Sequence, residues 1–233
     1  MSKVDGIAFI HGGANGAWNW SDIRQQLLIP SIAIDLPGRG AADEILAGIT
    51  LEDWVNHSVG EIERQGWRKV MLVGHSLAGI TIPGVVERLG DAIAHIVYIS
   101  SMAPHEGKSA YDMMPVGLRD EVLRDKVFRP NARHLGVTGA MLRICEERSC
   151  NDAGQPFFAP ISRRAIAQIP STYIRLLEDE VLSDARQQDI IRELKPTFVI
   201  PLHGFHFAHI SNPDLICGVL STIAAMTPDQ AQE

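Results

Sequence analysis

The stretch 69–79, KVMLVGHSLAG, decides which fold the chain can adopt. It begins with a short apolar run, as expected of a central parallel strand that is buried on both faces. A sharp turn follows, and a helix is expected from about Leu77 to Leu89. A strand–turn–helix unit of this kind lifts a serine hydroxyl above the sheet. The stretch therefore predicts that Ser76 is a nucleophile, whereas a serine that only caps the helix is the alternative.

Small residues are needed two positions on either side of such a serine, because the turn crowds the backbone. Gly74 meets this requirement. The second position is Ala78, which departs from the strict G-x-S-x-G spacing by one methyl group. We expect the turn to tolerate that methyl group.

Working outward from this unit, apolar runs alternate with helical patterns, which predicts a mostly parallel central sheet flanked by helices. Strands are expected at 5–11, 31–35, 69–73, 94–99, 172–177 and 197–202. Helices are expected at 18–28, from the N-cap Thr50 onward, at 77–89, at 183–194 and at 213–225.

Residues 103–168 interrupt the alternation, since they contain no clear strand. So long an interruption inside a compact domain usually marks a lid or an insertion. We therefore expect a helical cap at 103–168, inserted into a core formed by 1–102 and 169–233. An ordinary helical layer with no part in binding is the alternative.

Acidic residues and histidines follow the two last predicted strands. The segment 178–180, EDE, follows one strand, and the segment 203–209, HGFHFAH, follows the other. A serine nucleophile needs a base and an acid that orients it, and the chain order serine, acid, histidine suits this arrangement. Three histidines at a spacing of three could instead bind zinc, although no carboxylate or thiol completes such a site locally. The strand at 94–99 ends in two serines and offers no acid.

The loop after the first strand, His11-Gly12-Gly13, is a candidate oxyanion loop. Two glycines let the backbone approach a ligand closely. The N–H groups of Gly13 and Leu77 are the expected oxyanion donors. We expect His11 to fix the loop by hydrogen bonds rather than to transfer protons, and a flexible loop without function is the alternative.

Composition narrows the class of protein. The formal net charge is −7 and the chain has no basic stripe, which argues against nucleic-acid binding. Its three cysteines match no zinc or redox spacing. No signal-peptide pattern or membrane span is recognisable, so we expect a cytoplasmic protein that acts on a small molecule, with no nucleic-acid or membrane partner.

Four segments together resemble the methylesterase and hydroxynitrile-lyase branch of the α/β-hydrolase superfamily. They are FIHGGANGAWNW at 9–20, the run from GHSLAG to AYDMMP at 74–115, STYIRLLEDEVL at 171–182 and HFAHISNPDLI at 206–216. The resemblance covers most of the chain and is weakest at about 115–165. It implies an α/β-hydrolase fold with a helical cap, and it implies a triad of Ser76, Asp179 and His206.

Two positions separate esterases from lyases within this branch. The lyases carry a threonine after the first histidine and a lysine after the catalytic one, where this chain has Gly12 and Phe207. The resemblance therefore implies an esterase that works through an acyl-enzyme without metal or cofactor. A hydroxynitrile lyase, or a ligand receptor with slow or no hydrolysis, is the alternative.

The sequence is least informative about the substrate. A pocket is expected at the carboxyl ends of the strands, beneath the cap, where it would bind small to medium apolar esters. The candidates for its walls, each of which could equally be a core residue, are Ala14, Trp18, Met102, Met113, Met114, Phe128, Phe158 and Phe207. The physiological substrate and the oligomeric state stay open, a homodimer being one option.

Overall fold

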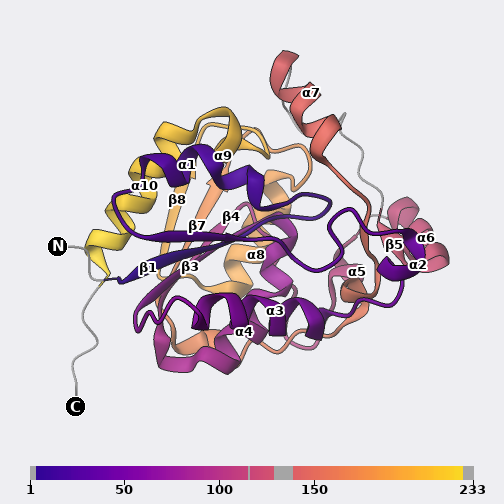
Figure 1. Ribbon diagram of the computed structural model, residues 1–233, viewed down its shortest axis with the longest axis horizontal. Coiled ribbons are helices and arrows are strands. Elements are labelled where there is room, and N and C mark those ends of the chain that lie inside the picture. Colours follow the sequence, from indigo (N-terminus) through magenta and orange to yellow (C-terminus); the bar gives the residue numbers. More distant parts are fainter. Residues whose placement is uncertain (1–3, 115, 129–138, 228–233) are drawn as a thin grey trace.

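A six-stranded sheet forms the centre of the protein (Figure 1), and its strand order is β2-β1-β3-β4-β7-β8. The computed structural model describes residues 4–114, 116–128 and 139–227. All five neighbouring strand pairs are parallel, which confirms the predicted parallel sheet. The strands are β1 (Gly6–Ile10), β2 (Ser31–Ile34), β3 (Val70–His75), β4 (Ile93–Ile99), β7 (Ser171–Leu176) and β8 (Phe198–Leu202).

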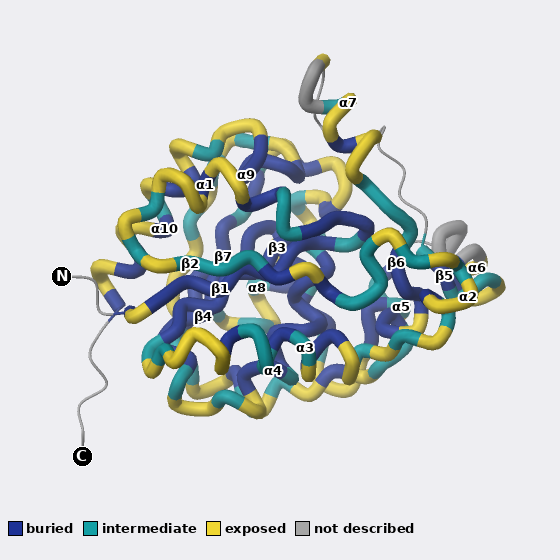
Figure 2. Tube along the Cα trace, viewed as in Figure 1, coloured by how far each residue is buried: buried dark blue, intermediate teal, exposed yellow. Residues whose placement is uncertain are grey.

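Helices cover both faces of this sheet, and its central strands are therefore buried throughout (Figure 2). Alternate residues of β3 enter different cores, since Leu72 packs on one face and Val73 on the other. The first face is covered by α3 (Leu51–Glu63), α4 (Ile82–Leu89) and α8 (Asp184–Leu194), and the second by α1 (Ser21–Gln26) and α10 (Pro213–Met226). None of the helices in the described ranges is long and apolar enough to cross a bilayer.

Helix starts follow local chemistry. Helix α3 begins at the predicted cap, where Thr50 and Asp53 form a reciprocal capping box. The helix expected at 77–89 is in fact a 3-10 helix, η2 (Ser76–Ile80), followed by α4, because Pro83 sits in the first turn of α4 and favours a new helix start. The helix expected at 18–28 is likewise split into η1 (Ala17–Trp20) and α1.

The elements α5, β5, α6 and α7 between β4 and β7 lie at one end of the sheet, to the right in Figure 1, where α7 projects from the body. The later part of this segment returns along α4, against which η6 packs. The expectation that the segment holds no strand is wrong, since two-residue strands β5 and β6 pair antiparallel. So short a pair leaves no period in the sequence. The elements here are α5 (Ala110–Met113), α6 (Val116–Asp125), β5 (Val127–Phe128), α7 (Gly139–Arg148), β6 (Asp152–Ala153), η5 (Gln155–Phe158) and η6 (Ala165–Gln168). Residues 115 and 129–138 of the predicted cap lie outside the described residues, and its boundaries stay a prediction. Elsewhere the chain forms α2 (Asp43–Leu46), η3 (Gly90–Ala92) and α9 (Ala208–Ser211).

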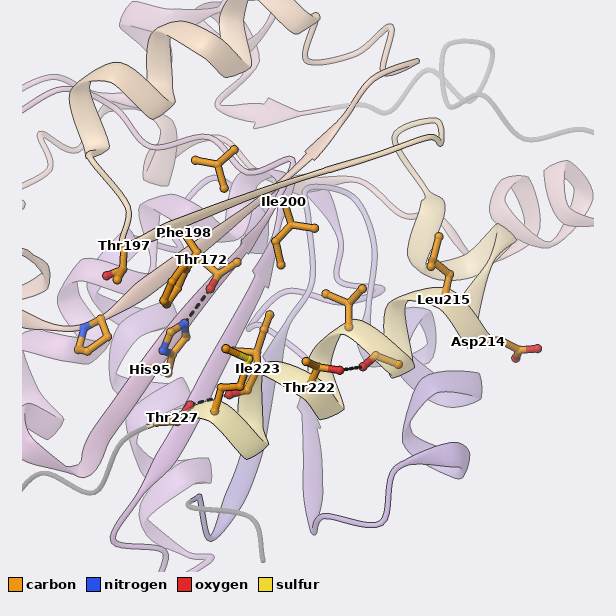
Figure 3. A pocket seen from close by; sticks show the side chains of 15 residues that line it. His95, Thr172, Thr197, Phe198, Ile200, Asp214, Leu215, Thr222, Ile223 and Thr227 are labelled. Atoms are coloured by element: carbon orange, nitrogen blue, oxygen red, sulfur yellow. Dashed lines mark hydrogen bonds between the residues drawn. The ribbon is translucent and has the colours of Figure 1, made fainter.

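The edge strand β8 leaves an apolar groove of about 830 Å³ between itself and α10 (Figure 3). Pro201 is compatible with β8 because an edge strand does not need every N–H in a ladder. His95, near the start of β4, lies in the wall of the groove and is 2% exposed. Its Nε2 lies 2.9 Å from the Thr172 hydroxyl.

Burial lowers the pKa of His95 from 6.5 to about 4. Because the unfolded chain takes up this proton near pH 6.5 and the folded chain only near pH 4, the free energy of unfolding decreases as pH falls between these values. We expect His95→Gln to reduce that decrease by up to about 1.4 kcal/mol per pH unit. Urea unfolding of both proteins between pH 4.5 and 7.5 measures it. Parallel pH profiles would contradict the assigned shift.

Candidate active site

Three predicted site residues meet at the carboxyl edge of the sheet. Ser76 follows β3, Asp179 lies just beyond β7 and His206 lies just beyond β8. The Ser76 hydroxyl lies 2.9 Å from Nε2 of His206, and Nδ1 of His206 lies 2.6 Å from Oδ2 of Asp179. Because parallel strands end at a common edge, residues far apart in the sequence form one chain of hydrogen bonds.

The turn at Ser76 is strained and firmly held. Ser76 has a φ of 51°, a left-handed conformation that serine rarely adopts. Its carbonyl accepts hydrogen bonds from the Met102 N–H at 2.8 Å and the Ser101 hydroxyl at 2.7 Å. A Cβ on Gly74 would lie 3.0 Å from the Ala78 methyl carbon, so the glycine makes room for the alanine that departs from the usual spacing.

Gly79 is a structural requirement that the sequence reasoning did not identify. A Cβ at this position would lie 1.6 Å from the Met102 carbonyl oxygen and 2.7 Å from the Ser101 hydroxyl oxygen. The segment after β4 therefore packs directly on the backbone of the turn. The only sequence feature that could have indicated this contact is that a glycine directly follows the segment Gly74 to Ala78.

We expect Gly79→Ala to lower the free energy of unfolding by at least about 2 kcal/mol, because backbone must move to admit the methyl group. Gly218→Ala is the matched control, since a Cβ there meets nothing within 4 Å. Alanine in this exposed helical position should stabilise by about 0.5–1 kcal/mol. Urea midpoints of the two variants should move in opposite directions, and equal shifts would contradict the close contact.

The carboxylate of Asp179 is buried and fully hydrogen-bonded. Oδ1 accepts the N–H groups of Val181 and Leu182, each at 2.8 Å. Oδ2 accepts the Ser100 hydroxyl at 2.5 Å as well as the imidazole of His206. Burial alone would raise the pKa of Asp179, but the hydrogen bonds from His206, Ser100 and Leu182 outweigh it and lower the pKa below 3.8. The carboxyl group is therefore ionised at neutral pH.

Ser100 is a second residue that the sequence reasoning missed. The end of β4 was noted only as a place with no acid, whereas Ser100 there donates to the acid supplied after β7. It is fully buried and has a φ of 35°. Nothing in the sequence distinguishes it from its neighbour Ser101, which points to the Ser76 carbonyl instead.

The neighbouring acids and histidines have other partners. Glu178 is exposed and lies 2.7 Å from Nδ1 of His203. His209 is 1% exposed, and its ring packs at a tilt against the rings of Trp20 and His75. Burial lowers its pKa to about 3. No group of three His, Cys, Asp or Glu side chains suited to a metal converges within the described residues.

The predicted oxyanion loop lies against the serine turn. A Cβ on Gly12 would lie 2.9 Å from Cβ of Ser76, and one on Gly13 would lie 3.1 Å from Cδ2 of Leu77. Both glycines are therefore needed for close approach. Leu77 is in the first turn of η2, where backbone N–H groups have no intrahelical partner. The arrangement brings two candidate donor segments together beside the hydroxyl.

His11 links this loop to the loop after β2. Its Nδ1 donates to the Gly12 carbonyl at 2.8 Å, and its Nε2 accepts the Leu36 N–H at 3.1 Å. Burial, and then the nearby Arg39 charge, lower the pKa of His11 to about 4. A neutral imidazole in this position can hold the loop, as the sequence analysis expected.

The structure distributes the predicted pocket residues over two regions. Met102 and Phe128 border the turn and the oxyanion loop, since a Cβ on Gly13 would lie 3.4 Å from the Phe128 ring. Ala14 follows in the same loop and is 1% exposed. Phe207 is buried against the rings of His75 and His206, and Trp18 packs on the same cluster.

The other three candidates pack in the core on the α3 and α4 face, the same core against which Met102 and Phe128 pack. Met114 is buried, whereas Met113 and Phe158 are half-buried. Phe158 lies against the Tyr111 ring and beneath the Lys126 ammonium. It also borders a surface groove formed with α3, α4 and Ile80 at the end of η2.

A protein-family model described as the alpha/beta hydrolase family matches residues 7–219. A carbendazim-hydrolyzing esterase of Nocardioides sp. (strain SG-4G) is 31% identical over 120 residues, which cover 50% of this chain and 50% of that esterase. A putative chloroplastic methylesterase of Arabidopsis thaliana, methylesterase 12, is 24% identical and covers 95% of this chain and 72% of its own length.

Among solved structures, an extracellular alpha/beta-hydrolase from a Paenibacillus species superposes with a TM-score of 0.80. It is 21% identical, and the match covers 94% of this chain and 98% of that one. The likeness shows that the two chains share the same fold.

Proposed function

We propose that this chain, which belongs to the alpha/beta hydrolase family, is a serine hydrolase that cleaves small to medium apolar carboxylic esters. The hydrogen-bond chain from Ser76 through His206 to Asp179 is the observation that carries the proposal. The esterase and methylesterases among its relatives support the same reaction class.

The first half of the reaction forms an acyl-enzyme. The His206 Nδ1–H donates to Asp179, which leaves Nε2 free to accept the Ser76 proton as the hydroxyl attacks the ester carbonyl. The backbone N–H groups of Gly13 and Leu77 stabilise the tetrahedral oxyanion. His206 then returns the proton to the leaving alcohol, and the ester bond to the alcohol breaks.

Water completes the cycle by the same route. Nε2 of His206 takes a proton from water as the water oxygen attacks the acyl carbonyl. His206 then returns that proton to the Ser76 oxygen, the bond between Ser76 and the acyl group breaks, and the acid is released. Asp179 stays ionised throughout and stabilises the imidazolium, because its four hydrogen bonds favour the charged carboxylate.

Phe207 argues against cyanohydrin cleavage. It takes the position after the catalytic histidine and is 2% exposed, with its ring edge-on to His206 at 5.5 Å. An apolar ring there provides no positive charge for a departing cyanide ion. The soft apolar side chains of Met102 and Phe128 near the turn suit an apolar acyl group better.

Ser76→Ala should reduce ester hydrolysis to near background without changing the unfolding midpoint by much, because a single hydroxyl is lost from a half-buried position. A fluorophosphonate probe should label the wild-type protein at Ser76, as read by peptide mass spectrometry, and should not label the variant. Substantial turnover by the variant would overturn the mechanism.

A chain-length series of p-nitrophenyl esters tests the substrate class, with mandelonitrile assayed in parallel. We expect kcat/KM to be highest for acyl chains of roughly two to eight carbons, the range that a bounded apolar pocket accepts. Cyanide release that outpaces ester cleavage would assign the chain to the lyases. Binding of every ester without turnover would assign it to the receptors.

A further inference from the structure

We propose that Arg39 and Asp152 form a latch that positions the oxyanion loop, so that the segment inserted between β4 and β7 holds part of the catalytic machinery in place. This inference rests on the proposed function, because it assigns the loop at Gly13 a role in ester hydrolysis. Neither residue touches the reacting atoms, so both are positioning residues.

Asp152 is the centre of the latch. Its side chain is completely buried in the short strand β6, and its Oδ1 is paired with the guanidinium of Arg39. Oδ2 accepts the N–H of Ala14 at 2.8 Å, and Oδ1 also accepts the N–H of Ala153 at 2.9 Å. A carboxylate with these three partners is well compensated for burial. It joins residues 138 positions apart in the chain.

Arg39 completes the connection from the loop after β2. Its second guanidinium nitrogen donates to the Asn15 carbonyl at 2.7 Å. The planar guanidinium therefore binds the carboxylate of Asp152 and the backbone of the oxyanion loop at the same time. Its side chain is only 13% exposed, so water screens this pair less than a surface ion pair.

The oxyanion loop needs such support because its backbone is unusual. Ala14 has a φ of 60°, a left-handed conformation that costs free energy in any residue with a Cβ. Both peptide groups of Ala14 are held by the inserted segment, since the Cys150 N–H donates to the Ala14 carbonyl at 3.0 Å. The Asn15 side-chain amide in turn donates to the Gly13 carbonyl at 2.7 Å.

These contacts fix the Gly13–Ala14 peptide, whose N–H donates to Asp152 and whose carbonyl accepts the Asn15 amide. They therefore restrain the backbone of Gly13 from its carboxyl side, next to the Gly12–Gly13 peptide whose N–H is the proposed oxyanion donor and whose carbonyl is held by His11. An oxyanion donor acts mainly on the transition state, where the carbonyl oxygen carries charge. Loosening the latch should therefore lower kcat with little change in KM. Loss of a side chain that merely stabilised the fold would change the unfolding midpoint, but it would not lower kcat selectively while leaving KM unchanged.

The experiment compares wild-type protein with Arg39→Gln, Asp152→Asn and the double variant. Complete loss of an oxyanion donor lowers kcat by roughly 10²- to 10³-fold, so displacement of one should lower it by about 10- to 100-fold. The double variant should be no worse than the poorer single variant, because both substitutions open the same latch. Arg39→Lys should recover part of the loss, since an ammonium can still pair with Asp152.

Hydrogen–deuterium exchange of the peptide that contains residues 12–16 measures how firmly the latch holds the loop, and it requires no activity assay. Exchange there should become faster in Arg39→Gln. The matched control is Arg88→Gln, which breaks the ion pair between Arg88 of α4 and Glu52 of α3 and should leave both exchange and kcat unchanged.

Unchanged exchange in Arg39→Gln and Asp152→Asn would overturn the latch. So would faster exchange with an unchanged kcat, because the loop would then move without affecting the reaction. A wild-type protein that neither cleaves esters nor reacts with the fluorophosphonate overturns the proposed function instead, and the exchange data still decide whether the pair holds the loop.

Discussion

The contact between the ends of β3 and β4 is the constraint on which the rest of the site depends. The Ser76 carbonyl receives two hydrogen bonds from residues 101 and 102, and Gly79 lies so close to the Met102 carbonyl that only a glycine fits. This contact holds the serine in a left-handed conformation that would otherwise relax. It also places Ser100 beside Asp179, so the chain just after β4 contacts both Ser76 and Asp179.

The buried acidic residues and the buried histidines near this contact have different surroundings. The carboxyl groups of Asp179 and Asp152 are each surrounded by several hydrogen-bond donors. The buried histidines other than His206 are kept neutral, since burial is the largest factor lowering the pKa of His11, His75 and His209. Among these histidines, His206 is the one whose ring nitrogens contact both Asp179 and the Ser76 hydroxyl. Such an arrangement suits a reaction in which a proton moves only along the Ser76–His206 axis.

The fold could be predicted from the sequence because each strand is marked locally. The parallel sheet is confirmed, and so is the resemblance to the methylesterase branch. The order of residues in the chain also suggested Ser76, Asp179 and His206, because the end of each parallel strand is visible as the end of an apolar run. Their roles remain proposals that the geometry supports.

What the sequence could not show are contacts between segments that are distant in the chain. In the sequence, Ser100 was noted only because no acid follows the strand at 94–99. Its hydrogen bond is made to a carboxylate 79 positions away. Asp152 belongs to a strand of two residues that has no period to detect. Arg39 resembled an ordinary turn residue in LPGRG. In each case the partner lies on another element, and only the packed structure identifies it.

These missed residues share a property that explains how the site is built. The serine turn is held from the β4 side by backbone and hydroxyl groups, whereas the facing oxyanion loop is held by a charged pair that includes a residue of the inserted segment. A tight backbone contact resists displacement more strongly than a network of side-chain hydrogen bonds, because it can relax only by moving whole strands. Ser76 is thus fixed by the sheet, while the proposed oxyanion loop depends on the inserted segment. If the loop has the proposed role, sequence changes in the inserted segment alter oxyanion stabilisation without displacing Ser76, His206 or Asp179.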